Sequence, residues 1–332
     1  MKAPARQRGA AILAALVTVA LVAGLSVAAF WRQWRGIEVE TAGRQALQAE
    51  WLLAGALEWA RGRVGEDGLR SPALDHPGEA WAQPVQGLPL QAFWAAGQSS
   101  PGQAPKNIGD TGPRTAADEA RLSLVIEDAQ GRLNLLNLLE GQAISPTWLA
   151  VFRRLFERLG LPPQQLELLA EQLRLANLGT TDAPPPARLP LVPMRQADLA
   201  WMGLTPATVD ALQAHVSLLP GRLPVNLNTA GPEVLGALLA LEPAQVQQLV
   251  ARRQAQPFAS LAATGLARTD EQMQSVNSHF FEVQAELQLG RQAPVTLREH
   301  ALLQRDGRDV RTLWQRRETP RPAAPASAAP KP

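Results

Sequence analysis

Cysteine is absent from the 332-residue chain, which excludes disulfides, thiol nucleophiles and zinc–thiolate sites. Strong net charge is absent too: the formal value is +2, with both signs interspersed, so no broad basic face indicates nucleic-acid binding. The four histidines lack the HxxxH spacing of a metal site, and no GxSxG motif is present. We therefore expect no enzyme, no cofactor, no nucleic-acid partner and no small-molecule substrate.

The amino-terminal segment contains the long apolar run that is the chain's most informative feature. Basic residues at Lys2, Arg6 and Arg8 precede Gly9, and no charge follows from Ala10 to Phe30. At about 1.5 Å of rise per residue, a helix of this length crosses a hydrocarbon core of roughly 30 Å. The run therefore predicts a membrane-crossing helix.

Three interpretations of this segment are open. A cleavable signal peptide would be cut after Ser26-Val27-Ala28 and would release an exported periplasmic binding or hydrolytic protein. A plain signal anchor needs nothing special at Gly9. A leader of the type IV prepilin kind would be cut at Gly9, and the apolar helix would be kept.

The residues after the apolar run favour the prepilin interpretation. They continue a helical pattern with an apolar stripe spaced by three and four residues, whereas a signal peptide is normally followed by a break. Gly36 and Gly43 predict a local bend. The stripe consists of Ala42, Ala46, Ala49, Leu53, Leu57 and Ala60.

The remaining chain changes its periodicity several times. Residues 62–114 are rich in Gly and Pro and predict a packed irregular segment, and residues 121–138 predict a β-hairpin that turns at Asp128 and Gly131. A helical block follows from Pro146, with Thr229 as a predicted N-cap. Alternating residues from Phe281 onward predict antiparallel strands, with a turn at Asp306-Gly307. This order predicts an α+β fold with an inserted α-domain.

Several stretches resemble the K-type minor pseudopilins of the bacterial type II secretion system. They are the leader "RQRG" with "AAILAALVTVALVAG", and then "DAQGRLNLLNL", "LPLVPMRQADLAWMGLT", "PVNLNTAGPEVLGAL" and "LLQRDGRDVRTLW". The resemblance implies a pilin-like fold, with a long N-terminal helix packed on an antiparallel sheet and a large inserted α-helical domain. The implied domains are a leader at 1–9, the helix at 10–62, the first part of the core at 63–138, the α-domain at 139–275, the C-terminal strands at 276–317 and a disordered tail at 318–332.

The resemblance also implies processing and partners. Prepilin peptidase would cut between Gly9 and Ala10, which places Ala14 at mature position five, where most pilins carry a glutamate. The implied protein is a non-enzymatic, single-pass inner-membrane protein with its globular part in the periplasm. It would initiate the pseudopilus at its tip and support export, with I- and J-type minor pseudopilins and the major pseudopilin as partners. We expect the stripe from Ala42 to Ala60, together with Ala14, to be the assembly face.

A calcium site of the family is doubtful in this chain. Many members carry several carboxylates in the inserted domain, but only Glu171 and Asp182 remain in the corresponding region. Calcium prefers six to eight oxygen ligands. We therefore expect no calcium.

A helix-hairpin-helix pattern at 228–253 raises DNA binding as a further alternative, as in a competence-type DNA receptor. Its hairpin contains Glu242 and no glycine, whereas the DNA-binding motif uses glycine amides to contact phosphate. Arg252 and Arg253 are expected on a solvated face. Packing within the inserted domain is the favoured interpretation.

Overall fold

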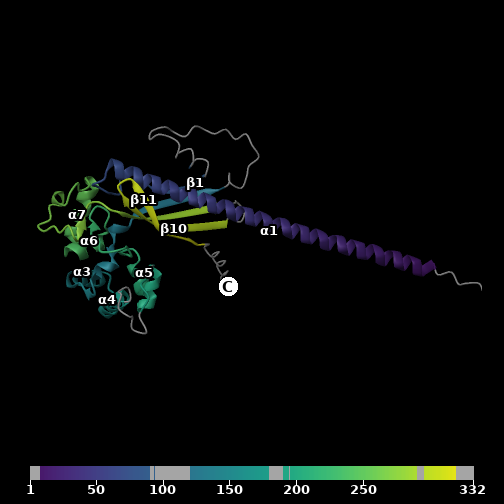
Figure 1. Ribbon diagram of the computed structural model, residues 1–332, viewed down its shortest axis with the longest axis horizontal. Helices are drawn as coiled ribbons and strands as arrows, with labels where there is room; N and C mark the ends of the chain where they lie inside the picture. Colours follow the sequence, from purple (N-terminus) through teal and green to yellow (C-terminus); the bar gives the residue numbers. More distant parts are fainter. Residues whose placement is uncertain are drawn as a thin grey trace, which may run out of the picture.

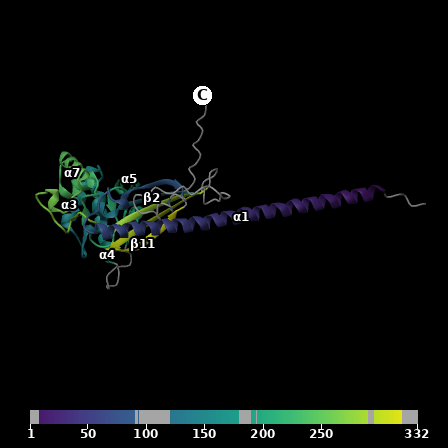
Figure 2. The same cartoon turned by 90° about the horizontal axis from the view of Figure 1, so that it is seen from above.

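The computed structural model describes residues 8–89, 93, 120–178, 190–193, 195–289 and 295–318. Of the predicted tail at 318–332, Glu318 ends the last strand, and the rest lies outside this part of the chain. One helix, α1 (Arg8–Arg70), forms a long stem whose second half lies on an antiparallel sheet (Figure 1). The remaining helices gather at the end of the molecule farthest from the start of α1, as both views show (Figures 1 and 2).

The sheet has five strands in the order β1-β2-β9-β10-β11, and all neighbouring pairs are antiparallel. Its strands are β1 (Val85–Pro89), β2 (Arg121–Asp128), β9 (Phe280–Leu289), β10 (Val295–Asp306) and β11 (Asp309–Glu318). Alternation along β9 buries Phe281, Val283 and Leu287 against α1, as the sequence predicts. The predicted turn at Asp306-Gly307 is confirmed, and Gly307 has a φ of 58°.

The α-helical domain is inserted between β2 and β9 and has its own apolar core. Trp148, Phe152 and Leu235 are fully or almost fully buried in it. Its helices are α3 (Pro146–Arg158), α4 (Pro163–Leu178), α5 (Pro206–Leu212), α6 (Pro232–Leu239) and α7 (Pro243–Ala255). The domain also contains short strand pairs. They are β3 (Leu133–Asn134) with β6 (Val216–Ser217), β4 (Leu139–Glu140) with β5 (Ala143–Ile144), and β7 (Val225–Asn226) with β8 (Gln274–Ser275).

The structure corrects the predicted end of the long helix. α1 continues through Gly36, Gly43 and Gly62 and ends at Arg70, eight residues beyond the predicted limit. Gly65 and Gly68 lie within this helix, and the turn between β10 and β11 packs directly against them. A Cβ at Gly68 would lie 2.2 Å from the carbonyl oxygen of Gly307. Gly65 and Gly68, in the segment that was expected to be irregular, therefore serve a close contact, whereas a Cβ at Gly36, Gly43 or Gly62 would meet no atom within 4 Å.

Two further local predictions are wrong. Residues 121–138 form no hairpin, because the Asp128 side chain accepts a hydrogen bond from the Gln130 amide and starts a 3-10 turn. The chain then leaves the sheet, and β3 pairs with β6. Thr229 does not cap α6: Gly231 holds the N-cap position, and the Thr229 hydroxyl donates to Asp128 instead.

Candidate functional site

The first half of α1 is an exposed apolar rod. Its large apolar side chains, from Ile12 to Val39, are all more than half exposed. The segment has a mean hydropathy of 2.5 over its best window and is long and apolar enough to cross a membrane. Trp31 and Trp34 follow the most apolar stretch and contact each other edge to face. Tryptophans commonly occupy membrane–water interfaces, so the position of this pair suits the end of a segment that could cross a membrane.

The predicted assembly face is wrong for four of its residues. Ala49, Leu53, Leu57 and Ala60 are buried against the chain's own sheet. The 3–4 spacing correctly identifies an apolar face, but it does not say what covers that face. The five-stranded sheet covers it within the same chain, so these side chains are closed to partners.

The outward face of α1 carries a different apolar pair. Leu47 and Trp51 are 59% and 77% exposed, and they lie one helical turn apart. Ala14 and Ala46 are exposed as well, so their predicted role stays open, and the side chain of Ala42 lies outside the described part. The i, i+4 spacing of Leu47 and Trp51 indicates a second apolar position on the helix surface, but the stripe from Ala42 to Ala60 is longer and is the more prominent pattern in the sequence.

The predicted processing site lies at the start of α1. Gly9 and Ala10 both fall within the helix as it begins at Arg8, and their side chains lie outside the described part. Cleavage between them stays a prediction.

A buried ionic cluster joins the stem to the α-helical domain, and sequence reasoning missed it. Arg305 of β10 is 4% exposed, and its Nη1 donates to Asp67 Oδ2 of α1 at 2.8 Å. Its Nη2 donates to both carboxylate oxygens of Asp75, at 2.8 and 2.6 Å, and to the carbonyl of Ser278 at 2.8 Å. The guanidinium also stacks on Phe281, 4.7 Å from the ring centre. One cation thus connects α1, β10 and the loop after α1.

Asp75 is bound to the α-helical domain through its backbone. Its amide donates to the carbonyl of Val276 at 3.0 Å, and its carbonyl accepts from Asn226 Nδ2 at 3.1 Å. Its carboxylate also accepts from the Ser278 amide at 2.7 Å. Asp67 and Arg305 belong to the stem and sheet, so the ion pairs lie across the seam between the two parts of the molecule.

A second buried carboxylate, Asp128, extends the cluster. Its Oδ2 accepts from Asn226 Nδ2 at 2.9 Å and from the hydroxyls of Thr229 and Ser278 at 2.6 Å each. Asn228 satisfies buried backbone groups nearby, since its Nδ2 donates to the carbonyl of Phe258 and its Oδ1 accepts from the Phe258 amide. The polar side chains at the seam therefore form a continuous hydrogen-bonded network within an apolar interior.

Burial dominates the electrostatics of this network. Desolvation raises the pKa of Asp75 to about 7, against the opposing effect of Arg305. Desolvation and then the negative charge of Glu79 raise the pKa of Asp67. The pKa of Asp128 is raised by burial as well, although four hydrogen bonds to its carboxylate oppose the shift. A single guanidinium does not offset the desolvation of the carboxylates around it.

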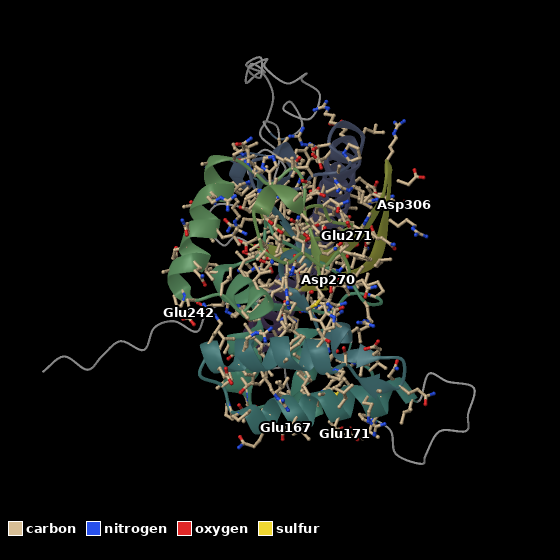
Figure 3. All side chains as sticks on the ribbon, turned by 90° about the vertical axis from the view of Figure 1, so that its left-hand side faces the viewer. Glu167, Glu171, Glu242, Asp270, Glu271 and Asp306 are labelled. Carbon is tan, nitrogen blue, oxygen red and sulfur yellow. The ribbon has the colours of Figure 1, made fainter. Side chains whose placement is uncertain are left out.

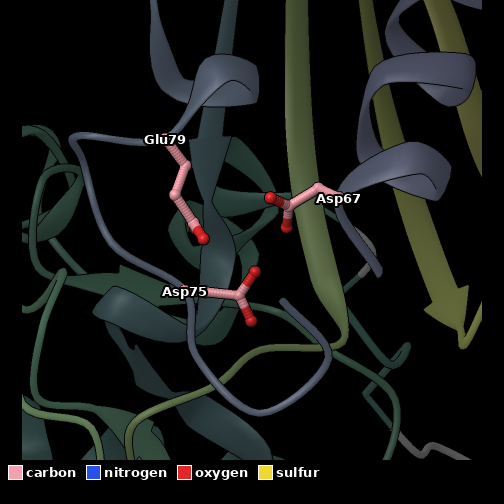
Figure 4. Close-up of side chains that lie close together, drawn as sticks. All are labelled: Asp67, Asp75 and Glu79. Atoms are coloured by element: carbon pink, nitrogen blue, oxygen red, sulfur yellow. The ribbon is translucent and has the colours of Figure 1, made fainter. Parts of the chain in front are cut away.

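Two groups of carboxylates bear on metal binding. The side chains of Asp67, Asp75 and Glu79 point toward one another (Figure 4), with oxygens within 4.8 Å, a set that could surround a cation. Arg305 already supplies positive charge to two of them. Of the doubted calcium ligands, Glu171 lies on α4 (Figure 3), where Arg174 binds both its oxygens, and Asp182 lies outside the described part.

The helix-hairpin-helix segment makes contacts inside its own domain. Arg252 donates to the carbonyls of Thr264 and Ala263, and Arg253 Nη1 donates to the carbonyl of Leu227 at 2.6 Å. The expectation of a purely solvated face is therefore wrong for Arg253, which is partly buried. Both guanidiniums serve packing of the domain.

Comparisons with known proteins agree with this architecture. Two family models, each described as type II secretion system (T2SS), protein K, match residues 131–221 and 225–279. The type II secretion system protein K of Pseudomonas aeruginosa is 28% identical over 86% of this chain and 85% of its own length. Its namesake from Klebsiella pneumoniae is also 28% identical, over 94% of this chain and 96% of its own.

A solved structure shares the fold. It is the crystal structure of the GspK-GspI-GspJ complex from the enterotoxigenic Escherichia coli type 2 secretion system, matched with a TM-score of 0.58 at 20% identity. The match covers 83% of this chain and 98% of the other. The predicted α+β fold, with its long helix on an antiparallel sheet and further helices, is confirmed.

Proposed function

We propose that the chain is a member of the type II secretion system protein K family and acts as a non-enzymatic minor pseudopilin at the tip of the pseudopilus, a proposal that the family models and the two relatives support. In this role it initiates the fibre and supports protein export across the outer membrane. The observation that carries the proposal is the continuous helix from Arg8 to Arg70, apolar and exposed in one half and bound to the sheet in the other.

The two halves of α1 suit two successive environments. The exposed apolar half is suited to the inner membrane before assembly and to sister helices of the major pseudopilin afterwards. The globular part would then lie in the periplasm. The α-helical domain, at the far end from the apolar half, would cap the fibre (Figure 1). No resident cofactor, calcium included, belongs to this proposal.

Prepilin processing gives the first prediction. We expect the mature chain, extracted from the bacterial inner membrane, to begin at Ala10 after cleavage by prepilin peptidase, because Gly9 ends a basic leader directly before the apolar helix. Intact-mass spectrometry measures the start, and an N-methyl group would add a second signature. A mature chain that begins near Ala29 would mean release by signal peptidase and would contradict the proposal.

The outward apolar pair gives the second prediction and concerns the partners. GspK is solved in complex with GspI and GspJ, which supports the I- and J-type minor pseudopilins as partners of this chain. With the inward stripe buried, we assign their docking to the face of α1 that carries Leu47 and Trp51. Large aromatic anchors often dominate such interfaces, with losses of 2 kcal/mol or more on truncation.

Trp51→Ala is therefore expected to weaken co-purification of the I- and J-type proteins by about 30-fold and to reduce secretion. The control is Trp201→Ala, since Trp201 is 65% exposed on the α-helical domain, away from this face. Both variants should keep the wild-type unfolding midpoint, because neither side chain is buried. Unchanged partner affinity in Trp51→Ala would contradict the assigned face.

A further inference from the structure

The carboxyls of Asp67 and Asp75 face each other across the seam between the stem and the α-helical domain. Asp67 comes from α1, whereas Asp75 is tied by its backbone to Val276 and Asn226 on the domain side. Their oxygens lie within 4.8 Å together with those of Glu79. Each carboxylate receives one arm of the same guanidinium, so the pair carries two negative charges against one positive charge when both are ionised.

We propose that a proton shared by Asp67 and Asp75 locks the α-helical domain onto the stem, and that this lock weakens as the pH rises toward neutrality. The proton removes the repulsion between two adjacent carboxylates and leaves one negative charge for Arg305. Like charges this close in a buried site cannot both ionise without cost. This inference goes beyond the proposed function and needs no partner protein.

Of the other charged groups around the pair, the carboxylates favour the bound proton, whereas Arg305 opposes it. Glu79 adds negative charge beside Asp67, and Asp128 adds it beside Asp75. Arg305 provides the positive charge that faces the pair from β10. His76 lies on the same loop as Asp75, and His279 Nδ1 lies 3.3 Å from the carbonyl oxygen of Arg305. Both histidines remain in the variants described below.

The sign of the pH dependence follows from the direction of the shifts. The pKa of Asp75 is raised to about 7 in the folded protein, from 3.8 in an exposed carboxyl, and that of Asp67 is raised as well. The closed seam therefore binds more protons than the open one, so its stability is greatest at acid pH and falls as the pH rises toward 7. Linkage limits the effect to about tenfold in the opening equilibrium per pH unit for each proton.

Hydrogen–deuterium exchange of the full chain in detergent micelles measures seam opening directly. The reporting amides are those of Asp75 and Ser278, which donate to Val276 and to the Asp75 carboxylate. Exchange is read between pH 5.5 and 8.5 and expressed as protection relative to the intrinsic rate. We expect protection at these amides to fall up to about tenfold per pH unit below pH 7, while amides in α3 keep theirs.

Two variants decide whether the carboxyl pair is responsible. Asp67→Asn removes the carboxyl that shares the proton and leaves Asp75 as the carboxylate bound to Arg305, so the slope with pH should become shallower; burial of Asp75 keeps a residual slope. Asp75→Asn removes the more deeply buried carboxyl and should flatten the slope further, and Asp67→Asn decides alone if Asp75→Asn does not fold. Glu66→Gln, at an exposed neighbouring position on α1, is the control that should keep the slope. A shallower slope in Asp67→Asn than in the wild type and in Glu66→Gln supports the proposal; a slope as steep as that of the wild type in Asp67→Asn, or wild-type protection that does not change with pH, overturns it.

Discussion

Replacement of Arg305 by methionine is expected to lower the free energy of unfolding by about 3–5 kcal/mol, the usual cost of removing one partner from a buried ion pair. The side chain is 4% exposed and forms ion pairs with two carboxylates, one of which is fully buried. Methionine keeps much of the apolar volume over Phe281 but removes the guanidinium that donates to Asp67, Asp75 and the Ser278 carbonyl. Urea unfolding of the full chain in detergent measures the loss.

The loss should depend on pH in a defined direction. Arg305 lowers the pKa of Asp75 against the larger effect of burial, so its removal raises that pKa further above 7. The variant then binds a proton in the folded state where the wild type does not, and the difference in stability grows as the pH rises above 7. Arg311→Met, at an exposed position on the neighbouring strand, is the matched control. A loss in Arg305→Met no larger than in this control would show that the cluster contributes little.

The sequence predicts the elements of this fold better than their contacts. Alternation along Phe281, Val283 and Leu287 fixes which side chains of β9 point inward, because strand periodicity acts within one segment. The stripe through Ala49, Leu53 and Leu57 likewise predicts a helix and its apolar face. It cannot tell a chain's own sheet from a partner's helix, since both are apolar surfaces, and that is where the predicted assembly face failed.

The ionic contacts at the seam could not be predicted from the sequence for a different reason. Arg305 binds Asp67 and Asp75 from more than 200 positions away along the chain, and each of these residue types is normally exposed. Asp128 was assigned to a hairpin turn because Asp and Gly three residues apart are typical of one. Only its hydrogen-bond partners Asn226, Thr229 and Ser278 show that this carboxylate belongs to the interior.

The contact of α1 with the β10–β11 turn gives the second large expected effect. Gly68→Ala should lower the free energy of unfolding by about 1–3 kcal/mol, as overpacking of a close contact does. The added Cβ would lie 2.2 Å from the Gly307 carbonyl oxygen and 3.0 Å from Arg305 Cδ. The first neighbour is backbone in a tight turn, with φ of 58° at Gly307, so it cannot move without distorting the hairpin.

The same helix supplies the matched control for this substitution. Gly62→Ala meets no atom within 4 Å and should stabilise the helix by about 0.5–1 kcal/mol, because alanine restricts the unfolded chain more than glycine does. Opposite signs at two glycines six residues apart would separate close packing from helix propensity. Equal stabilisation at both would mean that α1 and the turn do not approach this closely. Because Gly68 also borders Arg305, its alanine variant should reduce protection at the Asp75 and Ser278 amides, whereas Gly62→Ala should leave them unchanged.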